Sequence, residues 1–541
     1  MNPYALATST LAVYILSPFA AIAALLALTR ILTTINYWRS LRDFKDNGGK
    51  QVVHSPQLPY TIPFIGNAFQ FMGNQPGVPY RLFPRSTGVC SVLMGGMKTH
   101  ILYSPTVIQA LFRSKSATRD VFEVEMFSHV LAMPMEQIEH AEATKQNELE
   151  LNSKYLFNFE RVNELTSHFI TMLESALDED AEHVVSLDKI GLYEWLRKRM
   201  FTASCNTLFG EKLLEMYPDY CEDFFEFDSD LLSFFFRLPG IIMREANTRR
   251  AKIFDKLEKW GVEMWRQSGG SPIDPDGPSW EPIMGSRLNR ARHLDYRARG
   301  LNIRSAAALD AGITFALMSN VIPVTGWMLF SVLDPNAAPD VLPRVLAEIN
   351  RAKLPDGSLD VTALVSSPLL QSIFIETLRL NSDVLVTRNL TEDILLPLDE
   401  DGKRHVAFRK GDNVFAPSWL EHRDPDATWG SSKVAPDVFD ADRFIVKDPK
   451  TGEESFSMAR TAGRFFPFGG GKTICPGRNF AKQEAIGGLA TVLLRFEFEV
   501  KYNVDAEKKP TKDFPAFKRA FPGTGALAPG GDMVVKISRR T

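Results

Sequence analysis

The stretch FFPFGGGKTICPGRNF, Phe465–Phe480, decides the fold, because three glycines and a lone cysteine in it precede a helical pattern. Glycines at 469–471 allow the positive φ that a close approach to a bulky planar ligand requires, while Phe468 can pack beside the sulfur. Cys475 stands just before a helix expected from about Gly477 to Leu494, and the N–H groups at the start of that helix favour a thiolate. A thiolate is a suitable ligand for a soft iron site. The alternative interpretation is a buried structural cysteine in a glycine-rich turn.

The bulk composition excludes several classes of protein. The chain has 541 residues, 45% of them hydrophobic, which is enough for a large buried core. Its 62 basic and 65 acidic residues give a formal net charge of -3, so no nucleic-acid partner is expected. The four cysteines form no C-x-x-C pair and are too sparse for a disulfide framework or a zinc cluster, which favours a reducing compartment.

The N-terminal segment predicts a membrane anchor. Leu6–Leu28 contain no charged residue and are long enough to cross a bilayer as a helix. Basic residues follow this segment, which places the rest of the chain on the cytoplasmic side. A cleaved signal peptide is the competing interpretation, but such a peptide carries its basic charge before the apolar core. The predicted divisions are the anchor (1–35), a stiff proline-rich hinge (36–60) and one large catalytic domain (61–541).

Hydrophobic periodicity predicts a mainly α domain with small β-sheets. The helical patterns cover Phe159–Leu177, Tyr193–Phe209, Thr248–Trp265, Ser305–Leu333, Val341–Ala352 and Ser367–Leu380. The strand patterns cover Val89–Met94, Asp393–Leu396, Asp412–Ala416 and Phe496–Val500. The segment Ser271–Gly300, with four prolines and several arginines, predicts an exposed connection whose arginines face solvent.

The cysteine segment resembles the haem-binding signature of the cytochromes P450, F-x-x-G-x-R/H-x-C-x-G. The resemblance implies the P450 fold, a haem b cofactor (iron protoporphyrin IX) and Cys475 as the iron ligand. Thr473 occupies the position where the family usually has an Arg or His at a haem propionate, and neighbouring Lys472 is the candidate substitute. The residues expected to bind the cofactor are Phe468, Gly469, Gly471, Lys472, Cys475, Gly477 and Arg388.

Further motifs extend this resemblance over nearly the whole chain. IFIETLRL puts Glu376 and Arg379 three residues apart on one helix face, within ion-pair reach. With Arg443 in PDVFDADRF they resemble the structural Glu-Arg-Arg triad of the family, in which the planar guanidinium cannot be replaced well by Lys. Arg388 in LVTRNL matches a propionate-binding position, with a surface arginine as the alternative. EHRDP at 421–425 also fits the family pattern.

The predicted oxygen-side helix departs from the family pattern. It reads ALMSNVIPVT over Ala316–Thr325, which aligns Ser319 with the usual acid and Asn320 with the usual alcohol of the proton relay. These two are the candidate catalytic residues, since Asn320 can hold a water but has no readily exchanged proton. The departure resembles the branch of sterol and bile-acid hydroxylases and prostacyclin synthase, and also fungal tailoring members, which implies a terpenoid, steroid-like or otherwise lipophilic substrate.

Together these observations predict a monooxygenase that uses O2 to oxidise a lipophilic small molecule. No flavin or dinucleotide fingerprint follows a strand pattern, so an NADPH-cytochrome P450 reductase is the expected electron donor. Lys472, Arg478 and Lys482 are candidates for its docking patch, with ordinary solvated charges as the alternative. The expected location is the endoplasmic reticulum membrane, single-pass, with a cytoplasmic catalytic domain. Candidate pocket walls are Ile313, Ala316, Leu317, Val321, Val384 and Leu385.

Two other functions stay open. A haem isomerase or dehydratase of a peroxide needs neither a reductant nor a proton relay, and Asn320 in place of an alcohol is compatible with it. The third hypothesis is a membrane haem protein that only binds a gas or another ligand.

Overall fold

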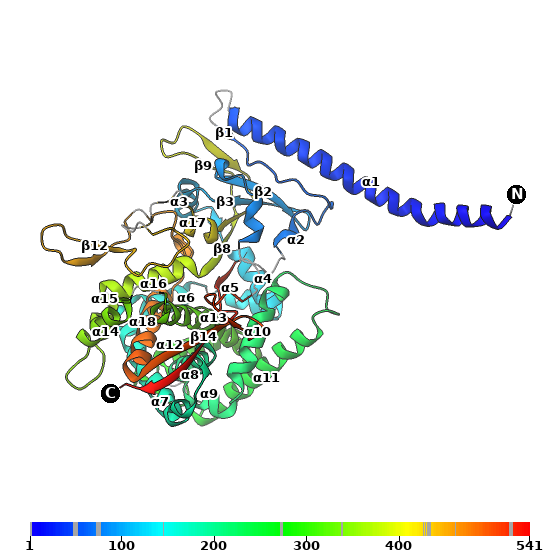
Figure 1. The fold of residues 1–541 in the computed structure, drawn as a ribbon. Coiled ribbons are helices and arrows are strands. Elements are labelled where there is room, and N and C mark those ends of the chain that lie inside the picture. The colour runs from blue at the N-terminus through cyan, green and yellow to red at the C-terminus, as the bar shows by residue number, and fades with distance from the viewer. Residues whose placement is uncertain are drawn as a thin grey trace.

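The computed structural model describes residues 3–46, 52–71, 77–143, 145–270, 274–336, 339–425, 427, 429, 434–459, 461–518 and 523–540. The body is mainly helical, and helix α1 projects away from it (Figure 1). The principal helices are α1 (Pro3–Asp46), α7 (Phe159–Ser186), α8 (Leu192–Phe209), α10 (Tyr220–Phe235), α11 (Arg244–Gln267), α12 (Arg287–Ala298), α13 (Ile303–Leu333), α14 (Val341–Arg351), α16 (Pro368–Leu380) and α18 (Arg478–Arg495). All six predicted helical segments lie within or largely overlap one of these helices, and α18 confirms the helix expected after Cys475.

Helix α13 forms the centre of the core. It packs against α8, α11, α16 and α18, and apolar side chains such as Trp327 and Leu329 are fully buried there. Asn302 caps its start by accepting a hydrogen bond from the N–H of Ser305. A helix that is apolar on almost every side is stable only where neighbours surround it, which is the case here.

Small sheets flank the helices. The largest has the strand order β16-β8-β11-β3-β2. The strands in this order are β2 (Val89–Met94), β3 (Met97–Leu102), β8 (Ser382–Leu390), β11 (Asn413–Pro417) and β16 (Thr524–Ala526), and the short β4 (Ala117–Thr118) also pairs with β8. A second sheet contains β14 (Phe496–Val504) and β17 (Asp532–Arg539), and a third contains β1 (Val52–Val53), β10 (His405–Phe408) and β9 (Ile394–Pro397). The four predicted strands correspond to β2, β9, β11 and β14, so the expected mainly α fold with small sheets is confirmed.

The prediction of an exposed connection over Ser271–Gly300 was wrong for its second half. Residues Arg287–Ala298 form α12, and the side chain of Arg290 is fully buried. The backbone carbonyls of Asp274 and Pro278 in the proline-rich loop accept hydrogen bonds from its guanidinium. A buried arginine is tolerated when acceptors surround it, and a loop rich in proline supplies carbonyl acceptors without competing N–H donors.

Helix α1 extends further than the predicted anchor. It runs without a break to Asp46, so residues 36–46, which we assigned to the hinge, are helical. Leu41 and Phe44 are buried against the body, and the carbonyl of Phe44 accepts a hydrogen bond from Arg404. The end of the anchor helix is therefore fixed to the domain.

The proline-rich segment that follows is also packed on the body. The N–H of Leu58 donates to the carbonyl of Ser91, and the N–H of Ser91 donates to the carbonyl of Pro56. Thr33 and Arg30 of α1 donate to the carbonyls of Tyr60 and Pro59. This segment is extended, as expected, but it joins α1 to the body through bonds on both sides.

Within the described part of the chain, two helices are long and apolar enough to cross a membrane. One covers Ser17–Phe44, with a mean hydropathy of 1.8 in its most apolar window and none of that window buried. The other is α13, which is largely buried and is therefore accounted for as a core helix.

Candidate functional site

The cysteine loop lies between strand β8, helix α3 (Pro105–Arg113) and the start of α18. The N–H of Cys475 donates to the carbonyl of Phe468 at 3.0 Å, which closes the loop around a half-buried thiol. Gly471 has φ +70°, and a Cβ there would lie 2.5 Å from the carbonyl oxygen of Phe112. Glycine is therefore required at Gly471 for the loop to approach α3.

Opposing influences act on the Cys475 thiol. Burial raises its pKa, whereas the backbone N–H of Gly477 and the positive charge of Arg478 lower it. Gly477 lies directly beside the sulfur, since a Cβ at that position would be 4.0 Å from Sγ. The start of α18 thus favours the thiolate as predicted, but burial opposes it in the protein alone.

Arg388 and Thr473 each carry a polar group that lacks its usual partner within the described part of the protein. Arg388 is 4% exposed and donates to the carbonyls of Gly470 and Thr387, both at 2.8 Å. Among the described residues it has no ion pair with a carboxylate, and burial lowers its pKa to about 10. The Thr473 hydroxyl is buried without a hydrogen-bond partner in the same set, whereas Lys472 is exposed.

The structure brings Glu376, Arg379 and Arg443 together in a fully buried cluster. The Glu376 carboxylate accepts hydrogen bonds from Arg379 at 2.7 and 2.9 Å and from Arg443 at 2.7 Å. Arg443 also donates to three backbone carbonyls of the segment between Val434 and Val438. This geometry joins α16 to the segment that precedes the cysteine loop.

His422 continues this network into the cysteine loop, a contact that the sequence did not reveal. Its carbonyl accepts a hydrogen bond from Arg379 at 2.7 Å, and its Nε2 accepts from the N–H of Phe466 at 3.1 Å. The ring stacks on Phe465, with centroids 5.2 Å apart. Burial and the positive charges of Arg423 and Arg379 hold the pKa of His422 well below its usual range, so the ring is neutral and can accept. The EHRDP motif at 421–425, which contains His422, was the only part of this contact that the sequence analysis had noted.

One face of α13 is less covered than the rest of the helix. Ala316 is exposed, and Ile313, Leu317 and Asn320 are half-buried, although most of α13 is buried. These residues are spaced three or four apart and share a face. Val321, predicted as a pocket wall, is 3% exposed and packs in the core, because it lies about 100° further around the helix. Val384 and Leu385 on β8 are half-buried.

Asn320 and Ser319 both have protein partners. Asn320 Oδ1 accepts a hydrogen bond from the N–H of Ala526 at 3.0 Å, and its Nδ2 donates to the carbonyl of Ala316 at 3.2 Å. The hydroxyl of Ser319 donates to the carbonyl of Phe315 at 2.6 Å. Their predicted role in organising water stays a prediction.

These contacts form a closed frame. Asn320 joins α13 to β16, and β16 pairs with β8. Arg388 joins β8 to the cysteine loop, and the loop continues into α18, which packs on α13. The α13 face, the β8 side chains Val384 and Leu385 and the Cys475 thiol are all only partly covered in this frame.

The residues of the frame fit a haem. Cys475 offers a sulfur ligand, and Gly469 and Gly477 leave space beside it, since a Cβ at either would meet nothing nearer than 3.9 Å. Among the described residues the buried Arg388 has no carboxylate ion pair and the Thr473 hydroxyl has no hydrogen-bond partner, so both are suitable partners for anionic propionates. The haem would therefore be held by the thiol, with its propionates toward Arg388 and Thr473.

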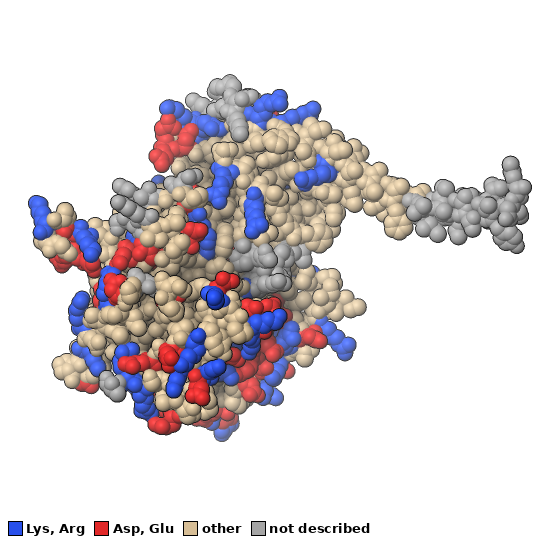
Figure 2. Space-filling view, viewed as in Figure 1, with Lys and Arg blue, Asp and Glu red and all other residues tan. Residues whose placement is uncertain are grey.

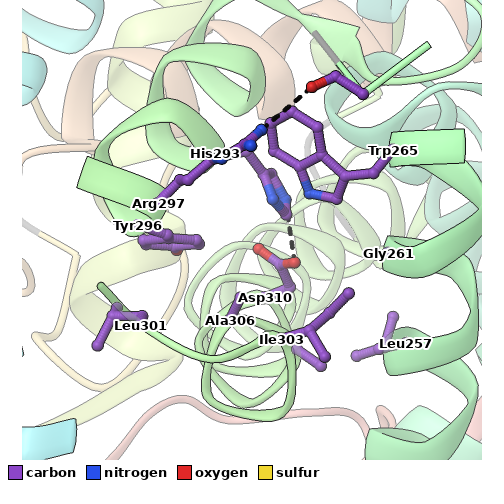
Figure 3. Close-up of a pocket in the computed structure, with 12 residues that line it drawn as sticks. Leu257, Gly261, Trp265, His293, Tyr296, Arg297, Leu301, Ile303, Ala306 and Asp310 are labelled. Atoms are coloured by element: carbon purple, nitrogen blue, oxygen red, sulfur yellow. Dashed lines mark hydrogen bonds and ion pairs between the residues drawn. The ribbon is translucent and has the colours of Figure 1, made fainter. Parts of the chain in front are cut away.

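A second cavity of about 260 Å³ lies elsewhere, between α11, α12 and the first turns of α13 (Figure 3). Its floor holds the buried pair His293 and Asp310, whose Nε2 and Oδ2 atoms are 3.1 Å apart. None of the predicted site residues lines it. Asp310 precedes Asn320 by about three helical turns, so this cavity is separate from the frame around Cys475.

Comparison with known proteins agrees with this arrangement. The family model for cytochrome P450 matches residues 56–520. Cytochrome P450 monooxygenase efuG from Hormonema carpetanum is 26% identical over 97% of this chain and 96% of its own length. Cholesterol 7-alpha-monooxygenase from Cricetulus griseus is 28% identical over 64% of this chain and 65% of its own length. The crystal structure of the cytochrome P450DA heme domain superposes with a TM-score of 0.63 at 15% identity, over 90% of this chain and 98% of that one, which supports the fold alone.

Proposed function

Since this chain belongs to the cytochrome P450 family of monooxygenases, we propose that it inserts one oxygen atom from O2 into a lipophilic small molecule. The observation that carries the proposal is the half-buried Cys475 thiol at the start of α18, in a frame that also holds the buried guanidinium of Arg388 and the unpartnered hydroxyl of Thr473. A bound haem b, with Cys475 as its iron ligand, would supply the chemistry that activates oxygen. Electrons would come from NADPH through a separate reductase.

The chain's own residues would bind and orient the substrate. Ala316, Ile313 and Leu317 present an apolar face of α13, and Val384 and Leu385 present apolar side chains from β8. Such walls exclude water and hold an unactivated C–H bond by shape. A steroid-like or terpenoid substrate agrees with these walls and with the similarity to cholesterol 7-alpha-monooxygenase.

The surroundings of α1 support membrane association. Exposed apolar side chains gather on the segments next to it and on the α10–α11 loop, including Phe64, Phe69, Ile241 and Ile242. The surface beside the projecting part of α1 is mostly uncharged in Figure 2. We place the chain in the endoplasmic reticulum membrane with one span and a cytoplasmic catalytic domain.

The reductase would dock near the cysteine loop. Of the three basic residues considered for its docking patch, Lys472 is exposed. Lys482 instead donates to Gln371 at 2.6 Å, and burial lowers its pKa to about 8. Arg478 donates to the carbonyl of Cys475 and lies over the Phe157 ring. Lys472 is thus the best candidate of the three for a contact with an acidic partner surface.

The full chain purified in detergent tests the proposal. We expect the reduced protein to bind carbon monoxide with the red-shifted Soret band of thiolate ligation, and Cys475→Ala to lose that band and all turnover. Cys205→Ala, a fully buried cysteine of α8, is the matched control and should keep the band. Wild-type protein without porphyrin, or full turnover by Cys475→Ala, would refute the assignment.

A second candidate reaction is the rearrangement of a peroxide without reductant. The observation that favours it is the engagement of Asn320 and Ser319 with backbone groups, which leaves no free alcohol at the relay position of α13. Measuring NADPH and O2 consumption against product separates the two, since a monooxygenase consumes both in proportion to product.

A further inference from the structure

Strand β16 is an edge strand that α13 covers. It pairs with β8 on one side, with Thr524 opposite Val384 and Ala526 opposite Ser382. On its other side the N–H of Ala526 donates to Asn320 Oδ1 at 3.0 Å. A buried backbone N–H needs a partner, and here one side chain supplies it from a helix 206 residues away in the sequence.

The orientation of the Asn320 amide is fixed by its other bonds. Nδ2 donates to the Ala316 carbonyl at 3.2 Å and lies 3.4 Å from Ser319 Oγ. The Ser319 hydroxyl hydrogen points to the Phe315 carbonyl, so Ser319 Oγ can accept. A rotated amide would place a donor against the donor of Ala526, and Oδ1 is therefore the atom that faces β16.

Two glycines in and beside β16 leave space for the Asn320 oxygen and for Leu385. Gly525 has φ +102°, and a Cβ there would lie 2.4 Å from Asn320 Oδ1. Gly523 has φ +88°, and a Cβ there would lie 2.5 Å from the Cβ of Leu385. Side chains at these positions would push β16 away from α13 or from β8, so the two glycines keep the strand between them.

The two ends of the segment have other partners. At one end, the Asp383 carboxylate of β8 accepts the N–H of Gly523 and the hydroxyl of Tyr80, the latter at 3.1 Å. At the other end, the indole N–H of Trp327, about two turns further along α13, donates to the Leu527 carbonyl at 2.5 Å. Helix α13 therefore holds the segment at two levels, and the Asn320 bond is the one beside the half-buried Val384 and Leu385.

We propose that Asn320 is a positioning residue that sets the width of the substrate site between α13 and the β8–β16 pair, and so selects which part of a bulky apolar substrate is presented for oxidation. The inference rests on the proposed function. The site it shapes is bordered by Ala316, Val384 and Leu385, all apolar and only partly covered, so a change in spacing alters contacts with the hydrocarbon part of a ligand. Asn320 would act through β16 and would not transfer protons.

Two substitutions of Asn320 distinguish the effect of its hydrogen-bond acceptor from the effect of its size. Asn320→Leu has a similar volume without an acceptor, and Asn320→Asp keeps an acceptor for the Ala526 N–H. Asn350→Leu is the control. Asn350 lies at an exposed position of α14, and its side-chain amide donates to the carbonyl four residues earlier, as that of Asn320 does. Hydrogen exchange at Ala526 measures the bond itself in the full chain.

The affinity of azoles for the ferric haem reports the width of the site between α13 and the β8–β16 pair. We expect Asn320→Leu to speed exchange at Ala526 about fivefold, as the loss of one hydrogen bond implies. The same variant should bind 4-phenylimidazole about fivefold more weakly, because the preorganised wall is lost. Its affinity for imidazole, which is too small to reach that wall, should change less than twofold, and Asn350→Leu should resemble the wild type. Asn320→Asp should keep the slow exchange at Ala526, because one carboxylate oxygen still accepts that N–H although the other faces the Ala316 carbonyl.

Unchanged exchange, or equal changes for both azoles, in Asn320→Leu would overturn the inference. If the wild-type protein forms the thiolate complex with carbon monoxide and Asn320→Leu still behaves like wild type, the positioning role alone is refuted. A wild-type protein that forms no thiolate complex refutes the proposed function instead.

Discussion

Replacing Glu376 with Gln tests the buried charge cluster. The Glu376 carboxylate accepts two hydrogen bonds from Arg379, one from Arg443 and one from the N–H of Asp440, and all three side chains of the cluster are at most 1% exposed. The amide leaves two buried guanidinium groups without an anion and turns an NH2 group toward one of them. Removing one partner of a buried pair costs about 3–5 kcal/mol, so we expect a loss of that size in the free energy of unfolding.

Urea unfolding of the purified full chain, followed by tryptophan fluorescence and the haem Soret band, measures this loss. Glu497→Gln is the matched control, because Glu497 is 53% exposed and pairs with Arg540 at 3.2 Å. An exposed pair contributes at most about 1 kcal/mol. If Glu376→Gln lost no more stability than Glu497→Gln, our account of the cluster as a buried electrostatic link would be wrong.

Three further substitutions probe other parts of the chain. Arg388→Gln removes the buried charge beside Gly470, and we expect haem to transfer to excess apomyoglobin about tenfold faster than from wild type. Burial raises the pKa of Glu484 to about 7, so between about pH 4.5 and 7 the folded state binds a proton that the unfolded state has released, and stability falls as pH rises. Glu484→Gln should abolish this fall, which amounts to as much as about 3 kcal/mol, in urea unfolding at pH 5 and pH 8. The double change of Ile241 and Ile242 to Asp should weaken vesicle binding of a chain without residues 1–29 at least about tenfold, since both side chains are exposed on the α10–α11 loop.

Each of these has its own control. Arg409→Gln, an exposed arginine near β10, should retain haem like wild type. If the free energy of unfolding depended on pH in the same way in Glu484→Gln and in wild type, the loss of stability with rising pH would come from other groups. Val262→Asp, on an exposed position of α11, should leave vesicle binding unchanged, and equal losses from both substitutions would contradict a local membrane contact.

The parts of the site that are coded by short motifs could be predicted from the sequence. The cysteine loop and the Glu376–Arg379 pair are such cases, because their residues are near one another in the chain and helical spacing alone brings the pair together. Long apolar helices such as α13 were equally clear, because burial on every side leaves a long hydrophobic run.

The missed features depend on contacts between distant segments. Nothing in the residues around Asn320 indicates that its oxygen meets the N–H of Ala526, and nothing around Arg290 indicates that carbonyls of a proline-rich loop enclose it. His422 was visible as part of a motif, but its bond to the Phe466 N–H appears only when the short helix α17 (Ser418–His422) packs on the cysteine loop. Val321 follows Leu317 by four residues and lies at the edge of the less covered face of α13, and its burial by neighbouring elements is not visible from helical spacing alone.

The continuous path of α1 into the body makes helix length a determinant of how the protein stands in a bilayer. In the proposed membrane anchoring, residues 17–44 would span about 42 Å at 1.5 Å per residue, more than the roughly 30 Å of hydrocarbon, so the last turns would project into water with the domain attached to them. Bonds from Arg30 and Thr33 to the proline-rich segment join these turns to the domain. Inserting a single alanine before Arg30 would turn the domain by about 100° relative to the preceding part of α1, so the residue count of α1 sets how the domain is oriented about the helix that carries it.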